Sequence, residues 1–151
     1  MDNNNHPIIE KIHARQILDS RGFPTIEVEI YAGGVVGRAA VPSGASTGEF
    51  EALELRDGDK KRFDGKEVSI AINNVINVFQ PHLINKRADD QEAIDALLIE
   101  IDGTENKSQY GANAMLGISM ACSVLSANFY NQSLYNYLNN DSATMPIPMI
   151  N

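Results

Sequence analysis

Alternation of apolar and polar residues marks three strands in the first third of the chain. The alternation is strict from Thr25 to Tyr31, which predicts a strand with one buried and one solvated face. The mixed segment 8–18 predicts a strand before it, and residues 35–41 predict a third strand after it. Short turn signals at 19–24 and 32–34 separate these segments. We therefore expect a three-stranded antiparallel meander.

Helical spacing replaces this alternation in the second half of the chain. Apolar residues recur every three or four positions from Val68 to Phe79, which predicts a helix that ends near Pro81. Asp89 and Glu92 resemble a capping box, so we expect Asp89 to be the N-cap of the next helix and Gly103 to close it. The charged segment 56–65 between sheet and helices is expected to be a solvated connector.

The most apolar part of the chain runs from Gly111 to Tyr130. It is rich in small residues and apolar on nearly all sides, which predicts a helix buried against close neighbours. Residues 133–140 predict a last short helix. The expected fold class is therefore α+β, with a three-stranded antiparallel β-meander followed by about four helices.

Length, charge and cysteine content narrow the functional classes. The 151 residues, 43% hydrophobic and 21% charged, suit one globular domain. A net charge of −8 argues against general binding to nucleic acid or anionic membranes. No membrane span or signal peptide is expected, which favours a cytoplasmic location. The single cysteine, Cys122, lies among apolar residues, so we expect a buried structural thiol.

Candidate chemistry is concentrated in the segment 43–48, between the predicted sheet and helices. It reads Ser43, Gly44, Ala45, Ser46, Thr47 and Gly48. Its hydroxyls and carbonyls are hard oxygen donors that suit Mg²⁺, and its N–H groups can form an anion-binding concavity. These properties fit a mobile loop that closes over a charged ligand. Composition alone favours the alternative, an ordinary solvated turn.

Five motifs follow one another in order without a large gap. They are Asp19-Ser20-Arg21-Gly22, Val41 to Gly48, Glu51 to Asp59, Asp102 to Ser108, and Gly111-Ala112-Asn113-Ala114. Together they resemble the N-terminal domain of enolase, also called phosphopyruvate hydratase. The resemblance implies a three-stranded antiparallel sheet followed by helices, ahead of a (β/α)₈ barrel of roughly 250 residues.

The resemblance also implies a domain organisation. Residues 1–7 would be a disordered tail, 8–140 the N-terminal or lid domain, and 141–151 a linker with the truncated start of the barrel, the barrel domain itself being absent. The apolar run from Met145 to Ile150 independently suggests the start of an element whose continuation is missing.

The activity implied is the reversible dehydration of 2-phosphoglycerate, a phosphorylated carboxylate, to phosphoenolpyruvate. A lysine or histidine base working with Mg²⁺ is an established feature of enolase-superfamily sites. In enolases the base, the acid and the acidic ligands of the tighter Mg²⁺ come from the barrel. The resemblance therefore assigns no catalytic residue within this chain, and the isolated chain is expected to be inactive.

The resemblance assigns roles to individual residues of this chain. Ser46 matches the loop serine that binds the second Mg²⁺, and Ala45 beside it approaches the substrate. Arg15, Arg21 and Glu27 match positions that form salt bridges with the partner's barrel in a homodimer. The alternative for these three is ordinary surface charge, which composition alone favours.

Two functions from different classes follow. The chain is the lid domain of a glycolytic enolase, with its own barrel domain as partner, or it is a non-enzymatic protein-interaction module that keeps the fold. In the second case the acidic surface and the apolar residues 147–150 would be the contact features.

Overall fold

The predicted meander is present as a three-stranded antiparallel sheet in the order β1-β2-β3. The computed structural model describes residues 6–44 and 48–139. The strands are β1 (Lys11–Leu18), β2 (Pro24–Ala32) and β3 (Val35–Ala40). Alternate β2 residues, Ile26, Val28 and Ile30, are fully buried, so one face of the sheet carries the core, as the alternation predicts.

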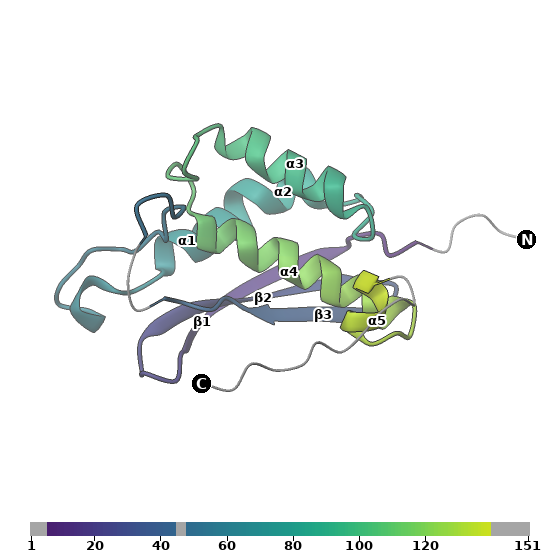
Figure 1. Ribbon diagram of the computed structural model, residues 1–151, viewed down its shortest axis with the longest axis horizontal. Helices are drawn as coiled ribbons and strands as arrows, with labels where there is room; N and C mark the ends of the chain where they lie inside the picture. The colour runs from purple at the N-terminus through teal and green to yellow at the C-terminus, as the bar shows by residue number, and fades with distance from the viewer. Residues whose placement is uncertain (1–5, 45–47, 140–151) are drawn as a thin grey trace, which may run out of the picture.

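Helices follow the sheet and confirm the α+β class. They are α1 (Ser69–Asn74), the π-helical segment η2 (Val75–Phe79), α2 (Gln80–Leu83), α3 (Gln91–Asp102), α4 (Ala112–Phe129) and α5 (Leu134–Asn139), with a short 3₁₀ turn η1 (Phe63–Gly65) before them. In Figure 1 α4 lies along one face of the sheet and α3 lies beyond α4. The core is the space between the sheet and this helical layer.

The helix predicted to end near Pro81 continues through the proline to Leu83. Gln80 N–H bonds to Val75 O, five residues back, at the end of the π-helical segment. Proline lacks the N–H that an α-helix would require at this place, and a π-bulge is one way for a helix to take up such an irregularity. The fully buried Val75 and Phe79 keep the run packed against the core.

The predicted N-cap of α3 is wrong by one residue. The carboxylate of Asp90, and not Asp89, accepts from Ala93 N–H at 3.3 Å. The helix closes as expected at Gly103, whose φ is 67°. The carboxylate of Asp89 does not cap α3 because it accepts hydrogen bonds from Arg87 and Tyr130.

Asp89 joins the N-terminal segment to the helical layer. It accepts hydrogen bonds from Arg87 at 3.0 Å and from the hydroxyl of Tyr130 at 2.6 Å, and it lies 2.8 Å from His6 Nδ1. Burial alone would raise the pKa of Asp89, but the hydrogen bonds outweigh it and lower the pKa to about 2. His6 and Pro7, placed by the sequence analysis in a tail, are held here, with Pro7 O accepting from Ala88 N–H.

Helix α4 is the central helix, as its composition predicts. It packs on β2 and β3, and a Cβ at Gly37 of β3 would lie 2.3 Å from Ala121 O and from Leu125 N. Only glycine permits this approach of strand and helix. Cys122 is fully buried, and burial raises its pKa to about 12, which confirms the expected structural thiol.

By length and composition α4 is also apolar enough to cross a membrane, a feature that the sequence analysis did not single out. In the domain, 56% of its residues are buried. A core helix of a globular domain has the same composition for the same reason, because it must be apolar on most of its surface.

Candidate functional site

The segment 43–48 leaves the sheet at the end of β3 and is held firmly on that side. Val41 N–H bonds to Ile26 O at 2.9 Å, and the buried hydroxyl of Thr25 donates to Val41 O at 2.7 Å. The Ser43 hydroxyl donates to Glu54 Oε2 at 3.2 Å and accepts from Arg56 Nη2 at 3.1 Å. Val41 is therefore fixed to the sheet, and Ser43 is fixed to two residues that follow the candidate segment.

Arg21 holds the backbone of the same segment from the turn between β1 and β2. Its guanidinium donates to Ser43 O at 3.0 Å and to Gly44 O at 3.4 Å, and Asp19 accepts from it at 3.0 Å. The carboxylate of Asp19 is oriented by Phe23 N–H, which, with Arg21, lowers its pKa. Arg21 was assigned by resemblance to the face of a homodimer, and here its contacts are with the candidate loop.

The middle of the segment, Ala45, Ser46 and Thr47, lies outside the described residues. On the C-terminal side of the segment, Gly48 N–H donates to Glu51 Oε2 at 2.9 Å, and Glu51 N–H donates to Gly48 O at 3.2 Å. The neighbouring Phe50 is 96% exposed. This C-terminal side is a local turn in solvent, unlike the N-terminal side.

A single buried amide fixes the chain after the segment. Asn113, 3% exposed, accepts from Leu55 N–H and donates to Leu55 O, both at 3.1 Å. Leu53 is held by two backbone hydrogen bonds. Its N–H donates to Asn106 O, and its O accepts from Ala112 N–H, both at 2.8 Å. Residues 53–55 are thus joined to the start of α4 almost as a strand would be.

Gly111 makes this approach possible. Its φ is 95°, and a Cβ there would lie 2.6 Å from Leu55 Cβ and 2.7 Å from Asn113 Oδ1. A side chain at this position would push residue 55 away from α4. The motif Gly111-Ala112-Asn113 therefore has a local physical reason: the glycine admits the neighbouring chain and the asparagine binds it.

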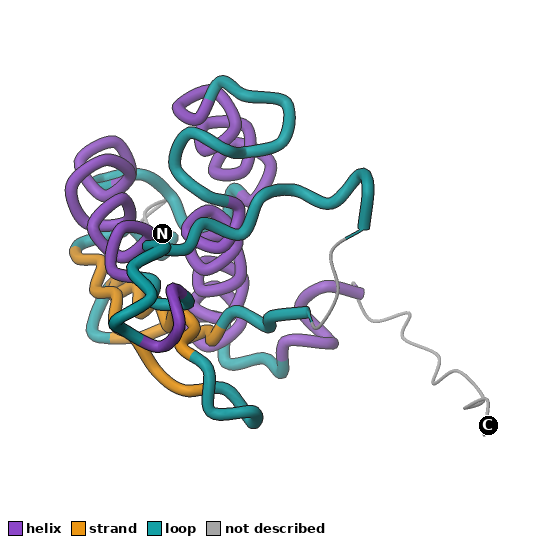
Figure 2. Tube along the Cα trace, turned by 90° about the vertical axis from the view of Figure 1, so that its left-hand side faces the viewer, coloured by secondary structure: helices purple, strands orange, loops and turns teal. Residues whose placement is uncertain are grey.

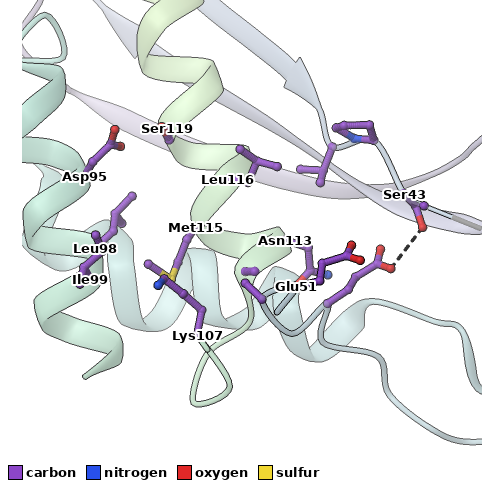
Figure 3. A pocket seen from close by; sticks show the side chains of 16 residues that line it. Ser43, Glu51, Asp95, Leu98, Ile99, Lys107, Asn113, Met115, Leu116 and Ser119 are labelled. Carbon is purple, nitrogen blue, oxygen red and sulfur yellow. Dashed lines mark hydrogen bonds between the residues drawn. The ribbon is translucent and has the colours of Figure 1, made fainter. Parts of the chain in front are cut away.

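An open groove of ≈ 460 Å³ lies beside the segment (Figure 3). Asp95, Leu98 and Ile99 of α3 line one side, and Met115, Leu116 and Ser119 of α4 line the other. Ser43 and Gly44 lie at one end, where the Ser43–Glu54 hydrogen bond is drawn. The lining is mainly apolar; among its polar side chains Glu51 lies toward Ser43, and Asp95 and Ser119 lie away from it (Figure 3). Figure 2 shows the described parts of the connection between β3 and α1 standing out from the body of strands and helices.

The described residues offer little to hold Mg²⁺. Residues 6–44 and 48–139 contain no group of three histidine, cysteine or acidic side chains that could hold a metal ion. The oxygens of Ser43 and Gly44 already accept from two arginines, and nearby cations disfavour a divalent ion. Ser46, the expected Mg²⁺ contact, lies outside the described residues.

Arg15 and Glu27 face each other across β1 and β2 on the outer face of the sheet. The Arg15 guanidinium bridges Glu27 and Glu29, the second at 2.5 Å. A hydrogen bond from Arg15 and a weaker effect of one from Tyr31 lower the pKa of Glu29. In turn, the carboxylates of Glu29 and Glu27 raise the pKa of Arg15. The structure brings these two residues together within the chain, and Arg21 lies apart from them beside the candidate segment.

Sequence reasoning missed two residues that shape the site, Arg56 and Asn113. Arg56 lies in the segment expected to be a solvated connector, but its side chain is only 20% exposed. That expectation is wrong at Arg56 and also at Asp57, whose carboxylate accepts from Ser69 and Ile70 N–H at 3.0 Å and caps α1. For Asn113, a polar amide in the first turn of an apolar helix was a usable signal, since a buried amide requires partners.

The family described as "Enolase, N-terminal domain" matches residues 9–138. The match covers the sheet, the candidate segment and the helices through most of α5.

Proposed function

Because the chain belongs to the enolase N-terminal domain family, we propose that it is the lid domain of a glycolytic enolase. The reaction is the reversible dehydration of 2-phosphoglycerate to phosphoenolpyruvate, as the resemblance implies. The family match over residues 9–138 is the observation that carries this proposal. We propose a homodimeric cytoplasmic enzyme, with Arg15, Arg21 and Glu27 at the dimer face.

The role proposed for this domain is to bring the segment 43–48 over a phosphorylated carboxylate bound by the barrel. Support comes from how the segment is mounted. Its N-terminal side is tied to the sheet through Arg21 and Arg56, and the chain after it is tied to α4 through Asn113. The candidate segment thus starts from a fixed point at Ser43 and is followed, beyond the local turn at Gly48 and Glu51, by a second fixed point at Leu55, and such anchoring supports a positioning role.

The proposed partner surface for the barrel domain is the groove and its rim. Ile99 and Leu116, which line it, are 51% and 42% exposed, and exposed apolar residues gathered in this way mark interaction sites. The surface adjoins Ser43 and Gly44, so a domain packed there would lie next to the candidate segment.

Mg²⁺ supplies electrostatic stabilisation of the negative charge that develops on the substrate. Ser46 is proposed as this chain's one contact to the second ion. The chain's other contributions are to orient Ser46 and to exclude water when the segment lies over the substrate. No proton transfer is assigned to a residue of this chain, and the isolated 151-residue chain is expected to show no turnover.

The test is the substitution Ser46→Ala in the full-length protein that carries this domain. We expect turnover of 2-phosphoglycerate to fall about 10²-fold, as for other misplaced reacting groups, with the thermal unfolding curve unchanged. Ser133→Ala, an exposed serine just before α5, is the matched control and should retain turnover. Full activity in Ser46→Ala would contradict the lid role and favour the interaction module.

A further inference from the structure

The groove between α3 and α4 offers apolar surface at two depths. Leu98 and Met115 are buried, whereas Ile99 and Leu116, which line the same groove, are exposed. Covering exposed apolar side chains removes them from water and is favourable, so an occupant of this part of the groove gains by presenting an aliphatic side chain.

Asp95 of α3 lines the same groove and is half-buried (Figure 3). Its Oδ1 accepts from Gln91 Nε2 at 3.1 Å. No basic side chain among residues 6–44 and 48–139 forms an ion pair with it. A carboxylate shielded from water is costly unless it is paired, and here its protein partner is one neutral amide.

Other shielded carboxylates of the domain are better served. Glu29, Glu67 and Asp89 each pair with an arginine. The buried Asp102 accepts from two backbone N–H groups, at 3.1 and 2.8 Å. Asp95 has neither arrangement, and it faces a groove in place of the core.

The other charges of the lining do not supply a partner for Asp95. Lys107 Nζ donates to a backbone oxygen at 3.0 Å, and Glu54 is paired with Arg56. Glu51, like Asp95, forms no ion pair within the described part of the chain. The lining therefore has two unpaired carboxylates against one unpaired ammonium, and a complementary occupant is basic.

We propose that the groove binds a segment of the barrel domain that inserts an aliphatic side chain between α3 and α4 and places a basic side chain against Asp95. This inference rests on the part of the proposed function that puts the barrel domain on the groove, and it adds the chemistry of the contact. Burial of Ile99 and Leu116 stabilises the contact. The charge pair at Asp95 fixes its register, as complementary charges do at interfaces.

Alkylation of a thiol at position 116 tests whether the groove is covered in the full-length protein. Leu116→Cys is treated with N-ethylmaleimide, and the modified peptides are followed by mass spectrometry. The native Cys122 is fully buried and does not compete. Ile70→Cys on α1 is the matched control, because Ile70 and Leu116 are similarly exposed in this domain. We expect Leu116→Cys to react at least about tenfold more slowly than Ile70→Cys, since a covered group reacts only when its contact opens.

Substitutions at Asp95, added to Leu116→Cys, test the charge pair. Asp95→Asn keeps the shape and removes the charge, and alkylation should become about tenfold faster because the basic side chain of the occupant loses its partner. Asp95→Glu keeps the charge and should keep the protection. Glu92→Gln, at an exposed acid of the same helix, should leave the rate unchanged. Asp95→Asn should not alter the rate of Ile70→Cys, which separates loss of the contact from loosening of the domain.

Three results would overturn the inference: equal rates for Leu116→Cys and Ile70→Cys, protection that Asp95→Asn leaves intact, and protection that disappears when the protein is diluted, which would assign the groove to a second copy. Turnover is read separately. If Ser46→Ala retains turnover while Leu116→Cys is protected through Asp95, the lid role fails and the proposed contact stands. If Ser46→Ala loses turnover while Leu116→Cys reacts freely, the contact fails and the lid role stands.

Discussion

The interface between α4 and the sheet and the connection between β3 and α1 are held together in opposite ways. The first is a continuous apolar contact in which Gly37 and Gly117 let backbone and helix approach closely. The second, in its described residues 41–44 and 48–68, has one short helical turn and is held by polar side chains, among them Arg56, Asp57 and Asn113. Burial of area stabilises the first, and individual directional bonds stabilise the second.

The largest effect is expected where the apolar interface is closest. In Gly37→Ala the new Cβ would meet the α4 backbone at 2.3 Å. Because neither backbone atom can move aside as a side chain could, we expect a loss of about 3 kcal/mol or more in the free energy of unfolding. Urea denaturation followed by circular dichroism would measure it.

Gly48→Ala is the matched control in the connection. Its Cβ would lie at ordinary contact distances of 3.8 and 3.9 Å from Glu51, so its midpoint in urea should stay close to that of the parent. Equal losses at the two glycines would show that the connection is packed as tightly as the core, and would remove the contrast.

The connection should show its dependence on single bonds at Asn113. Asn113→Ala leaves the N–H and the carbonyl of Leu55 without their partner, and unpaired buried groups of this kind cost about 1–3 kcal/mol each. We expect a total loss of about 2–3 kcal/mol, measured in urea. Asn128→Ala is the control on the same helix, since Asn128 donates one bond to Val36 O from an exposed position. A loss at Asn113 no larger than at Asn128 would show that the two hydrogen bonds between Asn113 and Leu55 do not hold the connection in place.

The same contrast explains what the sequence could predict. Period-two and helical spacing identify β2 and α4 because area burial repeats along the element. The bonds of Arg56 and Asn113 connect residues far apart in the chain and have no period, so they appeared only as motifs shared with a family. The predicted N-cap of α3 is wrong for a related reason. Asp89 and Asp90 both suit a cap, and the tertiary partners of Asp89 leave Asp90 as the cap.

Asp89 belongs to a polar cluster at the end of α4 that lies away from the groove, and this cluster too is held by individual directional bonds. Its pKa is about 2 in the fold against an ordinary value of 3.8. A depressed carboxylate pKa stabilises the fold above the ordinary value, and this contribution is lost as the pH falls toward the folded value. We expect Asp89→Asn to lose about 2 kcal/mol at neutral pH. The difference from the parent should shrink between about pH 4 and pH 2, as measured by urea denaturation.

Asp90→Asn is the neighbouring control. Asn caps a helix as well as Asp does, so the unfolding free energy of Asp90→Asn at neutral pH should stay close to that of the parent. A difference between parent and Asp89→Asn that does not depend on pH would contradict the assigned cause, because it would show that the Asp89 charge contributes nothing.

The smallest effect on stability is expected on the outer face of the sheet, at Arg15. Arg15→Gln removes the contacts to Glu27 and Glu29, but ion pairs near solvent contribute little to folding, so its urea midpoint should move less than in Gly37→Ala, Asn113→Ala or Asp89→Asn. In the full-length protein the same substitution should weaken dimerisation at least about tenfold, since an interfacial charge counts most when a partner desolvates it. Sedimentation equilibrium would measure it, with Arg62→Gln as control. An unchanged dimer would make Arg15 ordinary surface charge and restrict the functional surface of this domain to the segment 43–48 and the groove beside it.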